Sequence, residues 1–192
     1  MTSHYALILA AGFSKRFGED KRLYGSPSLI HQTLFSLLDA YDAVYIVHRY
    51  GQDTLQGVFS SEKIQYVGAP KFPIGLGESL AAGVLATPES CQSISVCLGD
   101  MPFIMTKTYR ELLSHVDSRS IVRPEFEHRS GHPVIFGSSW KPLLEQCVGD
   151  KGASFLLKEH HRYIKKIAVD DRGIITDIDT KHQWQKLFST NF

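Results

Sequence analysis

The sequence has few of the features that mark secreted, zinc-binding or membrane proteins. It contains only three cysteines, Cys91, Cys97 and Cys147, at wide spacing and without a C-x-x-C pair. This pattern argues against a disulfide framework and a zinc knuckle, and it predicts buried, inert thiols. No apolar run approaches the ~20 residues that span a bilayer, and residues 1–4 lack the start of a signal peptide. We therefore expect a cytoplasmic protein that does not enter a membrane.

An excess of charge of one sign is also missing. The formal net charge is +1 at pH 7, and no long basic run occurs. A nucleic-acid-binding protein usually carries a basic patch or stripe, so we expect no nucleic acid among the partners. Apolar residues make up 43% and charged residues 21% of the 192 residues, which favours a chain that folds as one domain over residues 1–192.

Short apolar runs alternate with segments of helical periodicity. The runs predict strands over residues 5–10, 43–47, 64–67, 94–98 and 164–169, and the periodic segments predict helices over residues 28–38, 52–59, 78–85, 106–115, 140–147, 153–158 and 183–188. This alternation predicts a Rossmann-like three-layer α/β/α sandwich with a mostly parallel sheet. Ligands of such sheets bind at the carboxyl ends of the strands, so a site is expected after the first and fourth strands.

Two segments depart from the alternation. Residues 121–136 contain two apolar runs around a polar middle, which predicts a hairpin or an excursion over the site. We expect this half of the chain to handle a second substrate. Asp170 and Asp171 precede Arg172 and Gly173, which indicates the turn of a hairpin and leaves both aspartates out of the site.

A loop rich in small and cationic residues, residues 9–21, follows the first predicted strand. Gly12 and its neighbours allow backbone N–H groups to approach an anion, and Arg16 and Lys21 add full positive charge. This combination suits a triphosphate, because nucleotidyl transfer requires cations where negative charge develops. The loop is neither a Walker loop nor a dinucleotide fingerprint. An ordinary surface turn is the alternative, which the position after the first strand disfavours.

Two further segments border the expected crevice. Asp100 directly follows the buried run of residues 94–98, beside Gly99 and before Pro102. Mg²⁺ prefers one or two carboxylates together with phosphate oxygens and water, so Asp100 is well placed to hold it, although it could only cap a helix. Residues 73–83 bring a flexible loop to the start of a predicted helix, where free N–H groups attract polar or anionic groups.

Segments from residue 9 to residue 180 resemble, in family order, the nucleotidyltransferases that include the molybdenum cofactor cytidylyltransferases. The first loop is similar to the signature L-A-A-G-x-S-x-R-x-G-x-x-K at Leu9, Ala10, Ala11, Gly12, Ser14, Arg16, Gly18 and Lys21. Residues 98–102 resemble the metal-binding motif that contains Asp100. Residues 177–180 resemble a D-x-D-T segment, which implies Asp179 as a second Mg²⁺ ligand with Asp177 in support; the alternative is that Asp179 or Thr180 caps the last helix.

The resemblance extends to the base and to the acceptor. Gly75, Ser79 and Gly83 match a segment beside the nucleotide base, although Ser79 could only start a helix. Residues 123–134 resemble a stretch that ends in R-G-H-P-V, which implies His132 as an acceptor contact. Residues 149–153 resemble G-D-x-G-A, which implies a similar role for Asp150 or Lys151. The chain departs from the family pattern at Ser26, Ser130 and Ser154, and Arg129 lies one residue before the usual arginine.

These matches imply a Mg²⁺-dependent nucleotidyltransferase. In the leading interpretation, a terminal phosphate of a molybdopterin-type acceptor attacks CTP and releases pyrophosphate. The pair Ala10 and Ala11 resembles the cytidylyl-transferring members, so CTP is favoured over GTP and ATP. The expected catalytic residues are Arg16, Lys21 and Asp100. The expected nucleotide-binding residues are Leu9, Ala10, Ala11, Gly12, Ser14, Arg16, Lys21, Gly75 and Ser79.

Other functions stay open at this point. The acceptor could be a sugar phosphate or a polyol phosphate, because this kind of fold serves many acceptors. A non-catalytic chaperone that carries the molybdenum cofactor is a third reading, whereas a redox enzyme is disfavoured because no dinucleotide fingerprint occurs. A molybdoenzyme or its maturation chaperone is the expected delivery partner. The sequence does not specify the oligomeric state.

Overall fold

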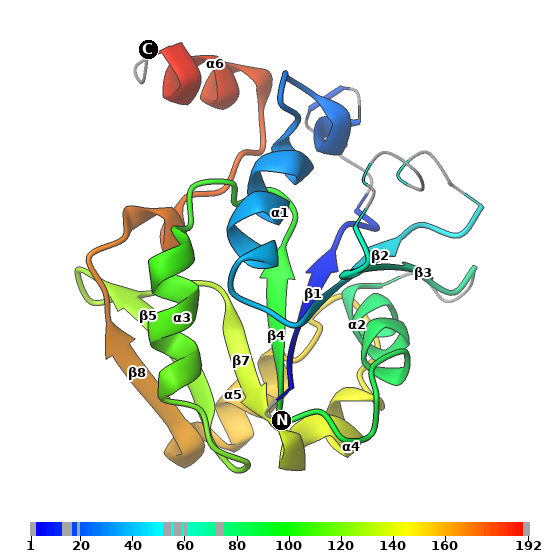
Figure 1. The fold of residues 1–192 in the computed structure, drawn as a ribbon, viewed down its shortest axis with the longest axis vertical. Coiled ribbons are helices and arrows are strands. Elements are labelled where there is room, and N and C mark those ends of the chain that lie inside the picture. The colour runs from blue at the N-terminus through cyan, green and yellow to red at the C-terminus, as the bar shows by residue number, and fades with distance from the viewer. Residues whose placement is uncertain are drawn as a thin grey trace.

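The computed structural model describes residues 3–12, 17–18, 20–51, 55, 59, 61–71 and 75–189. The strands in these ranges form one sheet in the order β3-β2-β1-β4-β7-β5-β6, with β8 paired to β5 (Figure 1). The strands are β1 His4–Leu9, β2 Ala43–His48, β3 Ile64–Gly68, β4 Ser93–Leu98, β5 Ile121–Phe126, β6 Arg129–Ser130, β7 Val134–Gly137 and β8 Ile164–Ala168.

The sheet is mostly parallel. β1, β2, β3 and β4 are mutually parallel, and β7 runs antiparallel to both β4 and β5. Because β7 is antiparallel to both of its neighbours, β4 and β5 run in the same direction, and β8 is parallel to β5. The carboxyl ends of β1 and β4 therefore leave the sheet side by side, at the edge where the sequence predicts the site (Figure 1).

Helices cover both faces of the sheet. They are α1 Leu29–Leu38, α2 Leu76–Leu85, α3 Thr106–Ser114, α4 Lys141–Leu144, α5 Ser154–Glu159 and α6 Lys181–Ser189. None of the described helices is both long and apolar enough to cross a membrane. The predicted helix over residues 52–59 falls largely outside the described residues.

Alternation along β1 separates two apolar layers, because successive side chains of a strand point to opposite faces. Ala6 and Ile8 pack in the cluster that contains α1 and α3, whereas Leu7 and Leu9 pack in the cluster that contains α2, α4 and α5. The predicted three-layer α/β/α sandwich is confirmed. The three cysteines are free and buried, as the sequence predicts.

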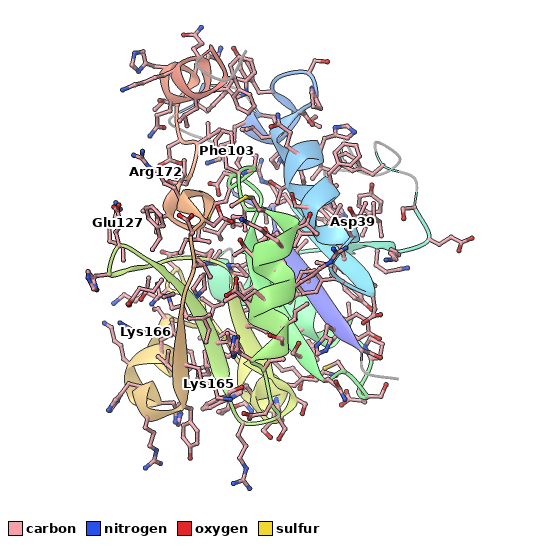
Figure 2. All side chains as sticks on the ribbon, turned by 60° about the vertical axis from the view of Figure 1, so that its left-hand side comes forward. Asp39, Phe103, Glu127, Lys165, Lys166 and Arg172 are labelled. Atoms are coloured by element: carbon pink, nitrogen blue, oxygen red, sulfur yellow. The ribbon has the colours of Figure 1, made fainter. Side chains whose placement is uncertain are left out.

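The polar middle of residues 121–136 forms the predicted hairpin. Glu125 pairs with Ser130 and Phe126 pairs with Arg129, so Glu127 and His128 alone make the turn. Both turn residues have positive φ, 47° and 63°, as two-residue turns between antiparallel strands require. Figure 2 shows Glu127 at the tip of this hairpin, away from the centre of the sheet.

The prediction of a second hairpin turn at Asp170 and Asp171 is wrong. β8 is followed by a 3-10 helix, Arg172–Ile175, which Asp171 caps by accepting a hydrogen bond from the Gly173 N–H at 2.9 Å. The other oxygen of the buried Asp171 carboxylate accepts from the Met105 N–H and from the Thr108 hydroxyl at the start of α3. One side chain thus fixes two helix starts that are far apart in the sequence.

Candidate active site

Lys21 lies between two carboxylates at the carboxyl edge of the sheet. Its Nζ donates to Asp100 Oδ2 at 2.7 Å, to Asp179 Oδ1 at 3.0 Å and to the Ile178 carbonyl at 3.2 Å. Burial by itself lowers the pKa of Lys21, but the two carboxylates outweigh it, so that the net shift is upward. Lys21 is therefore a charged ammonium held in place by three oxygen acceptors.

The fold explains why these distant residues meet. Leu9 and Leu98 are partners in the register of β1 and β4, so the loop after β1 and Asp100 after β4 leave the same edge. After β8 the chain returns to this edge, where the Ile178 N–H donates to the Asp100 carbonyl at 2.9 Å. This backbone bond brings Asp179 beside Asp100.

Aromatic packing holds the C-terminal helix against the short helix that begins at Lys21. Trp184 of α6 packs edge-on against Tyr24 with ring centroids 5.1 Å apart, and Tyr24 packs against Phe17 at 4.9 Å. In Figure 1, α6 lies beyond the carboxyl ends of β1 and β4, at the same end as this short helix. These contacts hold α6, which follows Asp179, against the short helix that begins at Lys21.

Thr180, and not Asp179, caps α6. The Thr180 hydroxyl accepts from the Gln183 N–H at 3.1 Å, and the Gln183 side chain accepts in return from the Thr180 N–H at 2.9 Å. This reciprocal pair is a capping box, which satisfies the first N–H groups of the helix. The Asp179 carboxylate is thereby left to Lys21, whereas Asp177 is exposed.

The carboxylates fit a magnesium ion that a ligand completes. Asp100 Oδ1 is buried and has no hydrogen-bond partner among the described residues. A buried oxygen without a partner is unfavourable unless a cation or donor satisfies it. No group of three or more metal-ligating side chains occurs in the described part of the chain, which argues against an all-protein cage. Mg²⁺ bound by one or two carboxylates and by phosphate oxygens meets both observations.

Two arginines contact the backbone of the loop after β1. Arg22 donates to the Ala10 carbonyl, and Arg49 donates to the carbonyls of Ala11 and Gly12. Our sequence-based prediction named neither arginine. Arg49 carried a signal, because it lies two residues after the predicted strand over residues 43–47, at the edge where ligands bind. The expected site residues Ser14 and Arg16 lie outside the described residues.

The expected base segment packs against a second loop. Gly75 is the N-cap residue of α2, and the hydroxyl of the buried Ser79 donates to the Gly75 carbonyl at 3.0 Å. The Gly77 N–H donates to the Gly149 carbonyl at 2.8 Å. Asp150, the next residue, is exposed and adjoins this segment. The structure thus brings the expected base-side residues together with Asp150.

His132 lies before β7, near enough to Asp100 to feel its charge. Its Nδ1 is 3.5 Å from the carbonyl of Val96 in β4. Burial, with the Arg123 charge, lowers the pKa of His132 and outweighs the Val96 carbonyl and the carboxylates of Asp100 and Asp177. The Arg123 Nε donates to the Gly131 carbonyl at 3.2 Å. The His132 imidazole is therefore uncharged at neutral pH, and the half-buried Arg123 lies near it, whereas Arg129 is exposed.

The fold is shared with solved structures. The chain superposes on Rv0371c of Mycobacterium tuberculosis H37Rv with a TM-score of 0.83 and 22% identity over 98% of each chain. The complex of Rv0371c with manganese gives a TM-score of 0.77 at 20% identity, again over 98% of each chain. A nucleotidyl transferase from a Methanothermobacter species (Mth528) gives a TM-score of 0.83 at 17% identity, over 99% of this chain and 98% of that one. The chain has the α/β nucleotidyltransferase fold.

The sequence comparison identifies the family. Residues 6–163 match the model of the MobA-like NTP transferase domain, so the chain belongs to this family of nucleotidyltransferases. The bifunctional protein GlmU of Xanthomonas campestris pv. campestris (strain 8004) is 25% identical over 136 residues, which are 68% of this chain and 30% of that relative. The chain thus spans about a third of the length of such curated relatives. The family resemblance in the motifs is confirmed at this level.

Proposed function

We propose that this chain transfers CMP from CTP to molybdopterin, with Mg²⁺, and releases pyrophosphate. The observation that carries the proposal is the contact of Lys21 with both Asp100 and Asp179, beside a loop of small residues at the carboxyl edge of β1. Nucleotidyl transfer requires such a gathering of a cation and metal-ligating carboxylates next to a phosphate site. Membership of the MobA-like NTP transferase domain family supports the reaction class. The pair Ala10 and Ala11 supports CTP.

The reaction is an in-line displacement. An oxygen of the acceptor's terminal phosphate forms a bond to the α-phosphorus of CTP, and the bond from that phosphorus to the β-phosphate oxygen breaks. The electron pair of the broken bond leaves on pyrophosphate. A phosphate monoester has a second pKa of about 6, so the attacking group is mostly a dianion at neutral pH and requires no general base.

The residues of the site have separate roles in the proposed reaction. Asp100 and Asp179 would hold Mg²⁺, which supplies neutralisation of the triphosphate oxygens. Lys21 would turn from the carboxylates to the phosphates and stabilise the negative charge of the leaving pyrophosphate. His132, beside Asp100, would contact the acceptor. The manganese bound by Rv0371c supports a divalent cation in this kind of fold.

The test is pyrophosphate release from the purified protein with Mg²⁺, molybdopterin and each of CTP, GTP and ATP. Release with CTP that the Asp100→Ala variant loses supports the proposal. If none of the three nucleotides releases pyrophosphate with molybdopterin, the proposal is contradicted. Release with a sugar phosphate or a polyol phosphate would then indicate a different acceptor. Binding of molybdopterin without any release favours a chaperone. A molybdoenzyme or its maturation chaperone is the proposed recipient of the product.

A further inference from the structure

Two guanidinium groups bind three consecutive carbonyl groups of the loop after β1. The Arg22 Nη1 donates to the Ala10 carbonyl at 2.7 Å. The Arg49 Nη2 donates to the Gly12 carbonyl at 2.7 Å, and its Nε lies 3.4 Å from the Ala11 carbonyl, at the long end for a hydrogen bond. The planar fork of a guanidinium can bind two carbonyls in a fixed geometry, whereas a lysine ammonium cannot.

The two arginines come from different positions next to the loop. Arg22 is only 5% exposed, and its Nε donates to Asp20 Oδ1 at 2.7 Å while its Nη2 contacts Asp20 Oδ2. Arg49 directly follows β2, whose residue Val47 accepts from the Ala10 N–H at 2.9 Å. Asp20 therefore fixes the Arg22 guanidinium, and Arg49 leaves the end of a strand that is hydrogen-bonded to the start of the loop.

The carbonyl bonds determine where the loop's N–H groups point. In a trans peptide, the carbonyl of one residue and the N–H of the next point in opposite directions. The bonds to the carbonyls of Ala10 and Ala11 consequently turn the N–H groups of Ala11 and Gly12 away from the two arginines. Within the described part of the chain, neither N–H has a hydrogen-bond partner. Gly12 is exposed and Ala11 is half-buried, so an anion can reach both.

We propose that Arg22 and Arg49 are positioning residues that orient the N–H groups of Ala11 and Gly12 toward the phosphates of the bound nucleotide. Successive N–H groups that point to one side form an anion-binding concavity. Donors oriented before binding need no reorganisation when the phosphate arrives, which strengthens the interaction. The inference rests on the nucleotide-binding part of the proposed function and not on the acceptor.

The test uses Arg49, because removal of the buried Arg22 risks the fold. Arg49→Met is compared with Arg49→Lys and with a matched control, Arg110→Met. Arg110 also donates to a backbone carbonyl, that of Asp39, at 2.9 Å, but this contact joins α3 to the end of α1. The measurements are the amide proton shifts of Ala11 and Gly12 during titration with CTP and Mg²⁺, and the Kd for CTP and for cytidine.

In the wild type and in Arg110→Met, CTP moves both amide protons downfield. In Arg49→Met the shift of the Gly12 amide is lost, whereas that of the Ala11 amide is kept, because Arg22 still binds the Ala10 carbonyl. CTP then binds about tenfold more weakly, the loss expected for a charge-assisted hydrogen bond, while the Kd for cytidine is unchanged. Arg49→Lys does not restore the Gly12 shift.

Three results would overturn the inference. They are full recovery in Arg49→Lys, unchanged shifts and affinity in Arg49→Met, and wild-type amides that do not respond to saturating CTP. If the wild type instead binds CTP with these shifts but never releases pyrophosphate, the transfer reaction fails and the positioning role stands.

Discussion

The Lys21 ammonium lies 2.7 Å from Asp100 Oδ2 and 3.0 Å from Asp179 Oδ1, so that one cation joins residues 79 and 158 positions away in the sequence. The lysine side chain is 17% exposed and the two carboxylates are 22% and 32% exposed, so solvent screens these contacts only in part. The ammonium occupies oxygens that the proposed function assigns to Mg²⁺. If the proposed function is right, Lys21 and a divalent cation would compete for Asp100 and Asp179.

Replacement of Lys21 by methionine should strengthen metal binding and slow turnover. Without the ammonium, two carboxylates face each other, and Mn²⁺ without nucleotide should bind about tenfold more tightly. Pyrophosphate release should fall by about 10² or more, because the charge that stabilises the leaving group is lost. Paramagnetic resonance of free Mn²⁺ measures the affinity. Weaker binding of Mn²⁺ would show that Lys21 supports the carboxylates instead of competing for them.

Loss of a carboxylate should slow turnover strongly at Asp100 and Asp179 and only weakly at Asp177. Asp100→Asn and Asp179→Asn should each lower the rate of pyrophosphate release by about 10²–10³. Asp177→Asn is the matched control, since Asp177 is exposed and two residues from Asp179. It should keep most of the activity and the melting temperature of the wild type. Equal losses in Asp177→Asn and Asp179→Asn would contradict the assignment of Asp179 as the metal ligand.

The sequence predicts those residues of the site that stand in a recognisable motif. Lys21, Asp100 and Asp179 stand in motifs with a chemical reading, and strand alternation predicts that the first two share an edge of the sheet. Arg22 is different, because a charged residue is normally assigned to solvent, yet it is 5% exposed. Its burial is apparent only in the folded structure, where it contacts Asp20.

Local patterns also misplaced one acidic residue. Asp171 stands in a segment with the composition of a turn, and the prediction followed that composition. Its partners, Met105 and Thr108, are 66 and 63 residues away and leave no local trace. Contacts of this kind follow from the arrangement of the strands and helices, which single-sequence patterns describe only in outline.

Two glycines of the family motifs should respond in opposite ways to alanine. A Cβ on Gly131 would lie 2.0 Å from the Ile174 carbonyl oxygen, so Gly131→Ala should lower the free energy of unfolding by about 1–3 kcal/mol. A Cβ on Gly12 meets no atom of the described residues within 4 Å. Gly12→Ala should leave stability within about 0.5 kcal/mol but weaken CTP binding, because the methyl group occupies the approach to the phosphates.

Urea denaturation and calorimetric titration with CTP separate the two effects. The account is wrong if Gly12→Ala is as destabilising as Gly131→Ala, or if Gly12→Ala binds CTP like the wild type. The first result would mean that the loop backbone has no room at Gly12. The second would mean that phosphates do not approach it.

The contact of Asp20 with Arg22 should stabilise the fold only above a certain pH. Burial raises the pKa of Asp20, but the hydrogen bonds and charge of Arg22 outweigh it and leave that pKa below its ordinary value of 3.8. Between the two values the unfolded chain binds more protons, so the stabilisation is complete above about pH 4 and is lost as the pH falls through the lowered pKa. Urea denaturation of wild type and Asp20→Asn should show a stability difference that shrinks below pH 3.8. A difference that does not change with pH would exclude this contact as its source.

Phosphorus NMR of a reaction with Mg²⁺, CTP and molybdopterin follows the bond that forms and the group that leaves together. We expect pyrophosphate and a new phosphoanhydride, in which the α-phosphorus of CTP is joined to the acceptor phosphate, to appear in equal amounts. Asp100→Asn should leave the CTP spectrum unchanged. Release of inorganic phosphate alone, or a wild-type spectrum that stays unchanged with molybdopterin, sugar phosphates and polyol phosphates in turn, would contradict nucleotidyl transfer.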